Sequence, residues 1–80
     1  MSFTVTIVSP KEKWEGRVDS LTLPGERGEL TLKTDHAPVF GKLKKGMIRA
    51  GAYQKEIAGG FFEFIDNLAR VAVDEAQGSL

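Results

Sequence analysis

Hydrophobic and polar residues alternate with a period of two along much of the chain, which is typical of β-strands with one buried face. Residues 3–8 give the clearest case, because Phe3, Val5 and Ile7 fall on one face and the residues between them fall on the other. No stretch of the chain shows a convincing 3.6-residue apolar period, which an amphipathic helix would require. The pattern therefore predicts strands rather than helices.

Further strands are predicted where β-rich runs lie between turn-forming residues. In residues 17–23 the alternation is irregular, because Val18 falls on the opposite face from Leu21. The pattern there leaves open a β-bulge or an early strand start. Val39 and Phe40 are both predicted to return to the interior. The remaining expected strands are residues 29–33, 47–52 with an extension toward 57, 61–65 and 68–73.

Glycine, proline and short polar residues mark the turns between these strands. Asp66-Asn67 can supply the positive φ angles of a tight hairpin, and Gly59-Gly60 is predicted to break the chain before residue 61. The other predicted turns are residues 24–28, 34–35 and 44–46. Roughly seven or eight short strands at this spacing indicate an all-β sandwich or barrel. We predict a single domain, residues 1–80.

Composition and charge narrow the range of functions. Hydrophobic residues make up 41% of the chain and charged residues 28%, as in an ordinary folded domain. The 11 Lys and Arg residues balance the 11 Asp and Glu residues, so no overall field attracts nucleic acid or an anionic membrane. The chain has no cysteine, which removes disulfides and thiolate metal sites. Any binding is therefore expected to come from local surface patches.

The residues offer no arrangement suited to catalysis or to a bound metal or cofactor. The one histidine, His36, directly follows Asp35, and adjacent residues of an extended chain point to opposite faces. Asp35 is therefore poorly placed to orient the imidazole, and His36 is interpreted as a loop residue with a local hydrogen bond or a partner contact. Gly25 and Gly28 precede a strand rather than a helix, which indicates a hairpin turn instead of a phosphate-binding loop. We predict no catalytic residue, no cofactor and no metal.

Two features favour an alternative function, that of a small nucleic-acid-binding β-barrel. Residues 60–64 are similar to the aromatic strand of an RNA-binding sheet. A local basic cluster consists of Lys42, Lys44, Lys45 and Arg49. Glu63 beside the aromatic residues and the balanced net charge argue against this function. In the simpler interpretation Phe62 and Phe64 belong to a packed face and the lysines to a solvated turn, so no nucleic-acid partner is predicted.

Residues 28–38 carry a longer motif. They read Gly-Glu-Leu-Thr-Leu-Lys-Thr-Asp-His-Ala-Pro, which resembles the epsilon subunit of rotary ATP synthases, whose members carry Gly-Glu-Leu-Gly-Ile, a short turn and then His-Ala-Pro. The similarity continues at residues 8–9, 14–16, 45–49, 59–63 and 71–74. Nearly the whole chain is similar to the N-terminal domain of that family, and the resemblance implies a two-sheet antiparallel β-sandwich.

Several positions differ from the family pattern. Thr31 replaces a usual glycine, Thr34-Asp35 replaces a Pro-Gly-like turn, and Lys45 stands where proline is common. These loops are therefore expected to differ in shape or mobility. Family members usually continue into a C-terminal helical hairpin that can bind ATP and obstruct rotation. Residues 1–80 do not include this hairpin, and as given they are expected neither to bind ATP nor to inhibit through it.

The resemblance implies a mechanical role. A non-catalytic subunit of the central stalk would couple the gamma subunit to the c ring of a proton- or sodium-translocating ATP synthase, and would meet the membrane only through that complex. The implied location is the cytoplasmic side of the bacterial inner membrane or the equivalent organelle face. The implied c-ring contacts are Glu29, Leu30, Thr31, Thr34, Asp35, His36 and Ala37. The implied gamma contacts are Ser9, Pro10, Phe40, Gly41 and Leu43.

Overall fold

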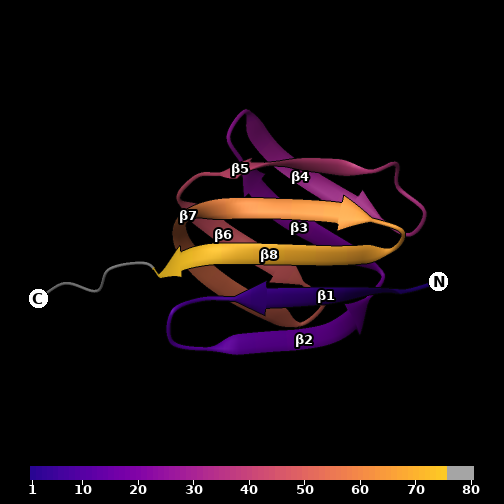
Figure 1. Ribbon diagram of the computed structural model, residues 1–80, viewed down its shortest axis with the longest axis horizontal. Coiled ribbons are helices and arrows are strands. Elements are labelled where there is room, and N and C mark those ends of the chain that lie inside the picture. Colours follow the sequence, from indigo (N-terminus) through magenta and orange to yellow (C-terminus); the bar gives the residue numbers. More distant parts are fainter. Residues whose placement is uncertain (76–80) are drawn as a thin grey trace, which may run out of the picture.

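The computed structural model describes residues 1–75 of the chain, as strands joined by short turns and loops (Figure 1). None of the described residues is helical. The eight strands are β1 (Phe3–Val8), β2 (Lys13–Val18), β3 (Ser20–Gly25), β4 (Gly28–Lys33), β5 (Val39–Leu43), β6 (Gly46–Ala50), β7 (Tyr53–Ile65) and β8 (Leu68–Glu75). The prediction of an all-β fold is confirmed, and residues 76–80 of the expected domain lie outside the described residues.

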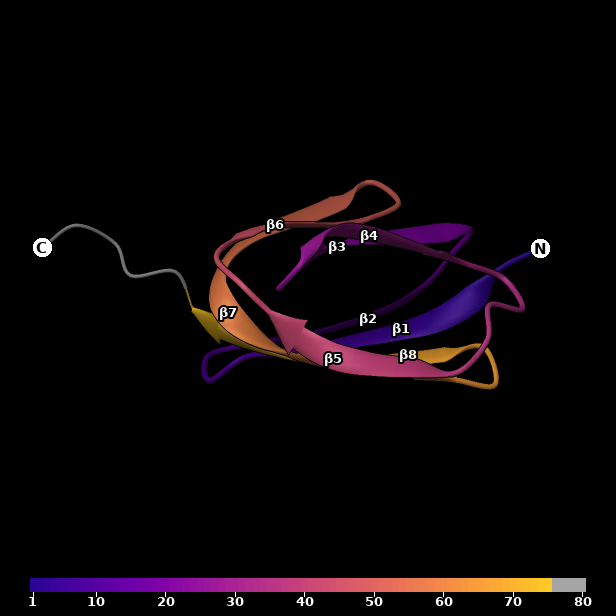
Figure 2. The same ribbon diagram turned by 90° about the horizontal axis from the view of Figure 1, so that it is seen from above.

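The strands form two layers that enclose one core (Figure 2). The first layer contains β2, β1, β8, β7 and β5, in that order across the sheet, and the second contains β4, β3 and β6. The first half of β7 pairs with β6, and its second half pairs with β5 and β8. The expected two-sheet sandwich is confirmed, except that β1 and β8 run parallel in an otherwise antiparallel arrangement.

One long bent hairpin joins the two layers. Residues 39–43 and 46–50 pair with β7 in a single continuous register, without a reversal between them. The bend lies at Lys44-Lys45 on one arm and near Gly59-Gly60 on the other, where β7 also shifts its register against β8. The turn predicted at residues 44–46 and the chain break predicted at Gly59-Gly60 are therefore wrong, because both segments bend a continuous hairpin instead.

The bend depends on glycine for a steric reason. Gly59 and Gly60 have φ angles of 155° and 151°, which residues with a side chain rarely adopt. A Cβ on Gly60 would overlap the carbonyl oxygen of Ala72 on the neighbouring strand. The backbones of β7 and β8 therefore approach each other so closely at the bend that no side chain fits between them.

The bend also changes which residues of β7 face the core. Before it Ile57 is buried, and after it Phe62 and Phe64 are buried. If the alternation of the first half continued unchanged, Phe61 and Glu63 would point inward instead. The phase change at the bend thus directs Phe61 and Glu63 to the outer face of the first layer.

Two expected strands are each divided in the structure. The segment 17–23 forms parts of β2 and β3, and the break between them lets both Val18 and Leu21 face the core. The irregular alternation of the sequence reflects this break. The segment 47–57 is divided by a turn in which Gly51 has a φ angle of 62°.

The core lies between the layers and contains only apolar buried side chains among the described residues. Phe3 and Phe64 pack edge to face, with ring centroids 5.1 Å apart. The prediction that alternate residues of β1 face the core is confirmed, and so is the prediction that Phe62 is buried.

Phe40 of β5 is 83% exposed, so the prediction that it returns to the interior is wrong. Val39 takes the inward side of β5, and a neighbour in an extended strand then points outward.

Two predicted hairpin turns are confirmed. Gly25 pairs with Gly28 at the end of the β3–β4 hairpin, and Gly28 has a φ angle of 137°. Asp66 and Asn67 join β7 to β8 with φ angles of 52° and 60°. Positive φ at both central residues is what a two-residue type I′ turn requires.

The edge strand of the first layer is fastened to the first half of β7. Trp14 of β2 stacks on Tyr53 of β7, with ring centroids 4.5 Å apart and planes at 11°. Lys55 Nζ lies 3.4 Å from Glu12 Oε2 and 3.1 Å from Glu75 Oε1, and the Lys55 side chain is only 11% exposed. These contacts hold the β1–β2 loop and the end of β8 against β7.

Lys55 of β7 and Glu75 at the end of β8 stabilise each other's charged forms. The Ser9 hydroxyl and the Lys55 ammonium lower the pKa of the Glu75 carboxyl below its ordinary value. The hydrogen bond to Glu75 raises the pKa of Lys55, although burial acts in the opposite direction. The stabilisation from Glu75 is complete above its unfolded pKa and is lost as the pH falls through its folded pKa. The stabilisation from Lys55 is complete below its unfolded pKa and is lost as the pH rises through its folded pKa.

Gly60→Ala is expected to destabilise the fold more than Gly28→Ala. Both glycines have positive φ angles, so either substitution strains the backbone by ~1–3 kcal/mol. Only the Gly60 variant also forces a Cβ into the backbone of β8, whereas nothing lies within 4 Å of a Cβ placed on Gly28. Urea unfolding of the two variants measures the difference. Equal losses in the free energy of unfolding would contradict the close approach of β7 and β8.

Glu75→Gln is expected to lower the Tm at neutral pH and to leave it unchanged in acid. Below the folded pKa of Glu75 the wild-type carboxyl is protonated and its advantage disappears. The Tm is measured at neutral pH and at several values below ~4.3, the ordinary pKa of glutamate. Glu56→Gln is the control, since it removes the same charge at an exposed position of β7. Identical pH profiles for the two variants would show that the ion-pair cluster contributes nothing.

Candidate functional site

His36 and Asp35 do not form a hydrogen-bonded pair. His36 is exposed, and its Nδ1 lies 2.7 Å from the carbonyl oxygen of Ala37. Asp35 is bonded to Asn67 rather than to the imidazole. The interpretation of His36 as a loop residue with a local hydrogen bond is confirmed.

Residues 1–75 contain no group of three or more His, Cys, Asp or Glu side chains placed to hold a metal ion. Within the same residues, no helix has the length and apolar character that a membrane crossing would need. The notable features of the described surface are patches of exposed side chains.

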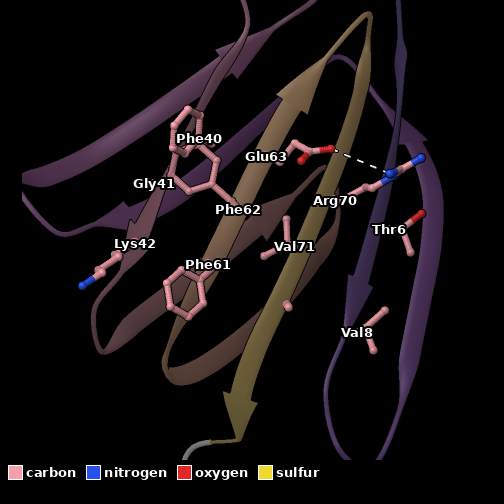
Figure 3. A pocket seen from close by; sticks show the side chains of 11 residues that line it. Thr6, Val8, Phe40, Gly41, Lys42, Phe61, Phe62, Glu63, Arg70 and Val71 are labelled. Atoms are coloured by element: carbon pink, nitrogen blue, oxygen red, sulfur yellow. Dashed lines mark ion pairs between the residues drawn. The ribbon is translucent and has the colours of Figure 1, made fainter.

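The outer face of β1, β8, the second half of β7 and β5, here called the front face, carries most of the exposed large apolar side chains (Figure 3). Phe40 is 83% exposed and Phe61 is 61% exposed. Val8 and Ile65 lie on the same face and are also exposed. Phe40 and Phe61 lie on neighbouring strands and line the same pocket, and a cluster of exposed apolar side chains is typical of a binding surface.

Cross-strand register brings these residues into two rows across the front face. One row places Lys42 opposite Phe61, Phe61 opposite Ala72, and Ala72 beside Val8. The other row places Phe40 opposite Glu63, Glu63 opposite Arg70, and Arg70 beside Thr6. Residues from strands far apart in the sequence thereby line one pocket. Its lining residues are Thr6, Val8, Phe40, Gly41, Lys42, Phe61, Phe62, Glu63, Arg70, Val71 and Ala72.

An ion pair lies within the apolar front face. Arg70 Nη1 and Glu63 Oε2 are 3.7 Å apart, and both side chains remain about half exposed or more (Figure 3). An exposed pair of this kind contributes little to stability, about 0–1 kcal/mol. Its position among apolar residues would instead orient a partner that offers matching polar groups at the centre of its contact surface.

The predicted gamma-contact residues lie in three different settings. Phe40 and Gly41 line the front-face pocket. Ser9 and Pro10 lie in the β1–β2 loop just beyond Val8, and Leu43 is buried in the core. The structure therefore brings together only part of the predicted set.

Val8, Phe61 and Ala72 belong to the same pocket but were absent from the predicted set. The sequence contained a signal for Phe61. Adjacent residues of a strand point to opposite faces, so Phe61 and Phe62 could not both enter one core.

The predicted c-ring residues form a strip that consists of part of one edge strand and the loop that follows it. Glu29, Leu30 and Thr31 lie in β4, an edge strand of the second layer. Thr34, Asp35, His36 and Ala37 lie in the loop of residues 34–38 between β4 and β5, here called the end loop. Leu30 is partly buried against the core, whereas Glu29 and Thr31 are exposed. Within β4 the chain rises ~3.3 Å per residue, so Glu29, near the start of the strand, lies away from the end loop that follows Lys33.

The features that favoured nucleic-acid binding do not persist in the structure. Phe62 and Phe64 are buried, which leaves Phe61 as the one exposed aromatic side chain of that segment. The basic residues are also separated, because Lys42 lines the front face while Arg49 lies on β6 and approaches Glu29 to 3.8 Å. The burial of Phe62 and Phe64 and the separation of Arg49 from Lys42 therefore give no support to the nucleic-acid alternative.

Known proteins are similar to this chain in sequence. Residues 2–79 match the family described as ATP synthase, Delta/Epsilon chain, beta-sandwich domain. The ATP synthase epsilon chain of Chlorobaculum tepidum is 34% identical over 80 residues, which cover 92% of this chain and 91% of that protein. The ATP synthase epsilon chain of Synechocystis sp. is 35% identical over 82 residues, which cover 96% of this chain but only 60% of that protein.

Two solved structures are similar in fold. A chain of the Tetrahymena thermophila mitochondrial ATP synthase central stalk and c ring superposes with a TM-score of 0.73 at 18% identity, covering 90% of this chain and 63% of that chain. A chain of the Euglena gracilis mitochondrial ATP synthase gives a TM-score of 0.78 at 19% identity, covering 90% of this chain and 50% of that chain. At this level of identity the likeness shows a shared fold.

Proposed function

The chain belongs to the ATP synthase delta/epsilon-chain family, through its β-sandwich domain, and on that premise we propose that it couples the gamma subunit to the c ring as a non-catalytic part of the central stalk. Its location is then the face of the membrane that carries the soluble catalytic sector, which is the cytoplasmic face in bacteria or its organelle equivalent. The coupled ion is a proton or sodium ion carried by the ring.

The front face is the proposed gamma-binding surface, and the exposure of Phe40 and Phe61 is the observation that carries this assignment. Burial of apolar surface contributes ~25 cal/mol per Å², so two exposed phenylalanine side chains form a strong potential anchor. Ser9 and Pro10 lie beyond Val8, where they would extend the contact along β1. Leu43 supports the surface from within the core.

The strip formed by β4 and the end loop is the proposed c-ring contact. Its exposed side chains are polar or charged at Glu29, Thr31, Asp35 and His36. Each exposed ion pair contributes only ~0.2–1 kcal/mol and is weakened by salt. Several weak contacts spread along an extended strip therefore act together, and the apolar front face supplies the larger share of the affinity.

The architecture suits a part that transmits torque. The core is continuous between the two layers, and one hairpin passes through both of them. A force applied at the front face reaches β4 through paired strands and close-packed side chains, without crossing a flexible linker. The domain would then turn as a rigid body with its two partners.

Phe61→Ser is expected to weaken binding to the gamma subunit by about 10- to 100-fold, the range for loss of an interface anchor. The thermal stability of the isolated domain should stay the same, because Phe61 does not belong to the core. Binding is measured with purified gamma subunit by calorimetry. Met47→Ser is the matched control, since Met47 is an exposed apolar residue of β6 in the other layer. Equal affinities of both variants and the wild type would overturn the front-face assignment.

Glu29→Lys is expected to weaken association of the c ring with the soluble catalytic sector while the domain stays folded. Among the described residues the ion pair of Glu29 is with Arg49, at 3.8 Å and with both side chains exposed, so loss of this pair costs the fold ~1 kcal/mol at most. The measurement is ring retention in reconstituted complexes at physiological salt, with Glu56→Lys as the control for the charge change on an exposed site of β7. Unchanged retention by Glu29→Lys would count against the β4 strip.

A further inference from the structure

The end loop is held by a side chain from a part of the sequence that is 32 residues away. Asn67, in the β7–β8 turn, accepts a hydrogen bond at Oδ1 from the backbone N–H of Asp35, at 2.7 Å. Its Nδ2 donates in return to Asp35 Oδ1, at 2.9 Å. The two residues thus form a reciprocal pair, and one of the two bonds involves a charged carboxylate, which makes it stronger than a neutral one.

Both members of this pair have unusual backbone conformations. Asp35 has a φ angle of 65° and Asn67 a φ angle of 60°. A residue with a side chain in this region is strained by ~1–2 kcal/mol unless local bonds compensate. At Asn67 the tight hairpin imposes the conformation. At Asp35 a turn closed by the hydrogen bond from the His36 N–H to the Lys33 carbonyl oxygen, at 3.1 Å, accommodates the conformation, and the bonds to Asn67 tie that turn to a distant part of the chain.

Asn67 is itself firmly placed. Its carbonyl oxygen accepts a hydrogen bond from the backbone N–H of Thr4, at 3.2 Å, which ties the β7–β8 turn to β1. The end loop has two other bonds to the rest of the chain: Thr34 Oγ1 donates to the carbonyl oxygen of Met1, and the His36 N–H donates to the carbonyl oxygen of Lys33. Met1 is almost fully exposed. The His36 ring lies edge to face with the buried Phe64, with ring centroids 6.0 Å apart, so this contact and the bonds to Asn67 are the firm side-chain contacts of the loop, and Asn67 is the one that holds its backbone.

We propose that Asn67 is a positioning residue for the end loop. It fixes the backbone of Asp35, and it thereby sets the direction in which His36 and Ala37 are presented. The consequence for partner binding rests on the proposed c-ring contact, whereas the effect on the loop belongs to this chain alone. A loop that is ordered before binding avoids an ordering cost of ~1–2 kcal/mol per residue when the partner docks.

Four variants test the pair. Asn67→Gly removes both side-chain bonds and leaves an Asp-Gly turn, which suits the hairpin. Asn67→Asp places a carboxylate against that of Asp35 and removes the donor. Asp35→Asn preserves both bonds, because an amide oxygen can accept from Nδ2. The double variant Asp35→Asn with Asn67→Asp reverses the side-chain bond, so that residue 35 donates and residue 67 accepts.

The readout is amide hydrogen exchange at residue 35, measured by NMR on the 80-residue chain with Tm recorded in parallel. We expect exchange to rise by ~10-fold or more in Asn67→Gly and Asn67→Asp, and to stay near the wild-type rate in Asp35→Asn and in the double variant. If Asn67→Asp is too unstable to assign, Asn67→Gly still tests the pair. Equal exchange in all variants, or no recovery in the double variant, would overturn the positioning role.

Ring retention by the same four variants separates this inference from the proposed function. Weaker retention in the two variants with a loosened loop, and normal retention in the other two, would support both. A loosened loop with unchanged retention would uphold the positioning role of Asn67 and remove the end loop from the proposed c-ring contact.

Discussion

The close approach of β7 and β8 at Gly59-Gly60 is the constraint on which the rest of the structure depends. It allows one hairpin to run through both layers in continuous register, and it shifts the phase of burial along β7. A one-residue shift of phase moves every later side chain to the other face of a strand. Phe62 and Phe64 therefore enter the core, while Phe61 and Glu63 reach the front face.

The front face follows from this geometry rather than from any single motif. Cross-strand pairing sets Phe61 beside Ala72 and Glu63 beside Arg70, and β5 adds Phe40 in the same row as Glu63. Side chains from β1, β5, β7 and β8 share this surface although the strands are far apart in the sequence. An apolar surface of this kind is unfavourable in water and becomes favourable when a partner covers it, which fits a subunit of a larger complex.

The sequence predicted the strands well where local chemistry decided them. The alternation in β1 and the Asp66-Asn67 turn needed no information from elsewhere in the chain. The bend could not be predicted in the same way, because Gly59-Gly60 is typical of a break, and only the opposite arm and the neighbouring strand show that it bends a continuous hairpin. Phe40 was misplaced for a related reason: an aromatic residue on a short strand is usually buried, and its exposure follows from Val39 facing inward.

The candidate surfaces were predicted in part. The family motif at residues 28–38 falls on β4 and the end loop, and the structure shows that this segment is an edge strand followed by a loop. The contribution of Asn67 had no local signal, since its partner Asp35 is distant in sequence and the contact depends on the β7–β8 turn lying against the end loop.

Hydroxyl-radical footprinting can show whether a partner covers the front face, by comparing side-chain oxidation in the free chain and in the assembled ATP synthase. We expect Phe40 and Phe61 to be readily oxidised in the free chain and protected in the complex, while Met47 on the other layer changes little. Equal oxidation of Phe40 and Phe61 in both states would mean that the front face stays uncovered in the assembly, and the proposed gamma-binding surface would then be wrong.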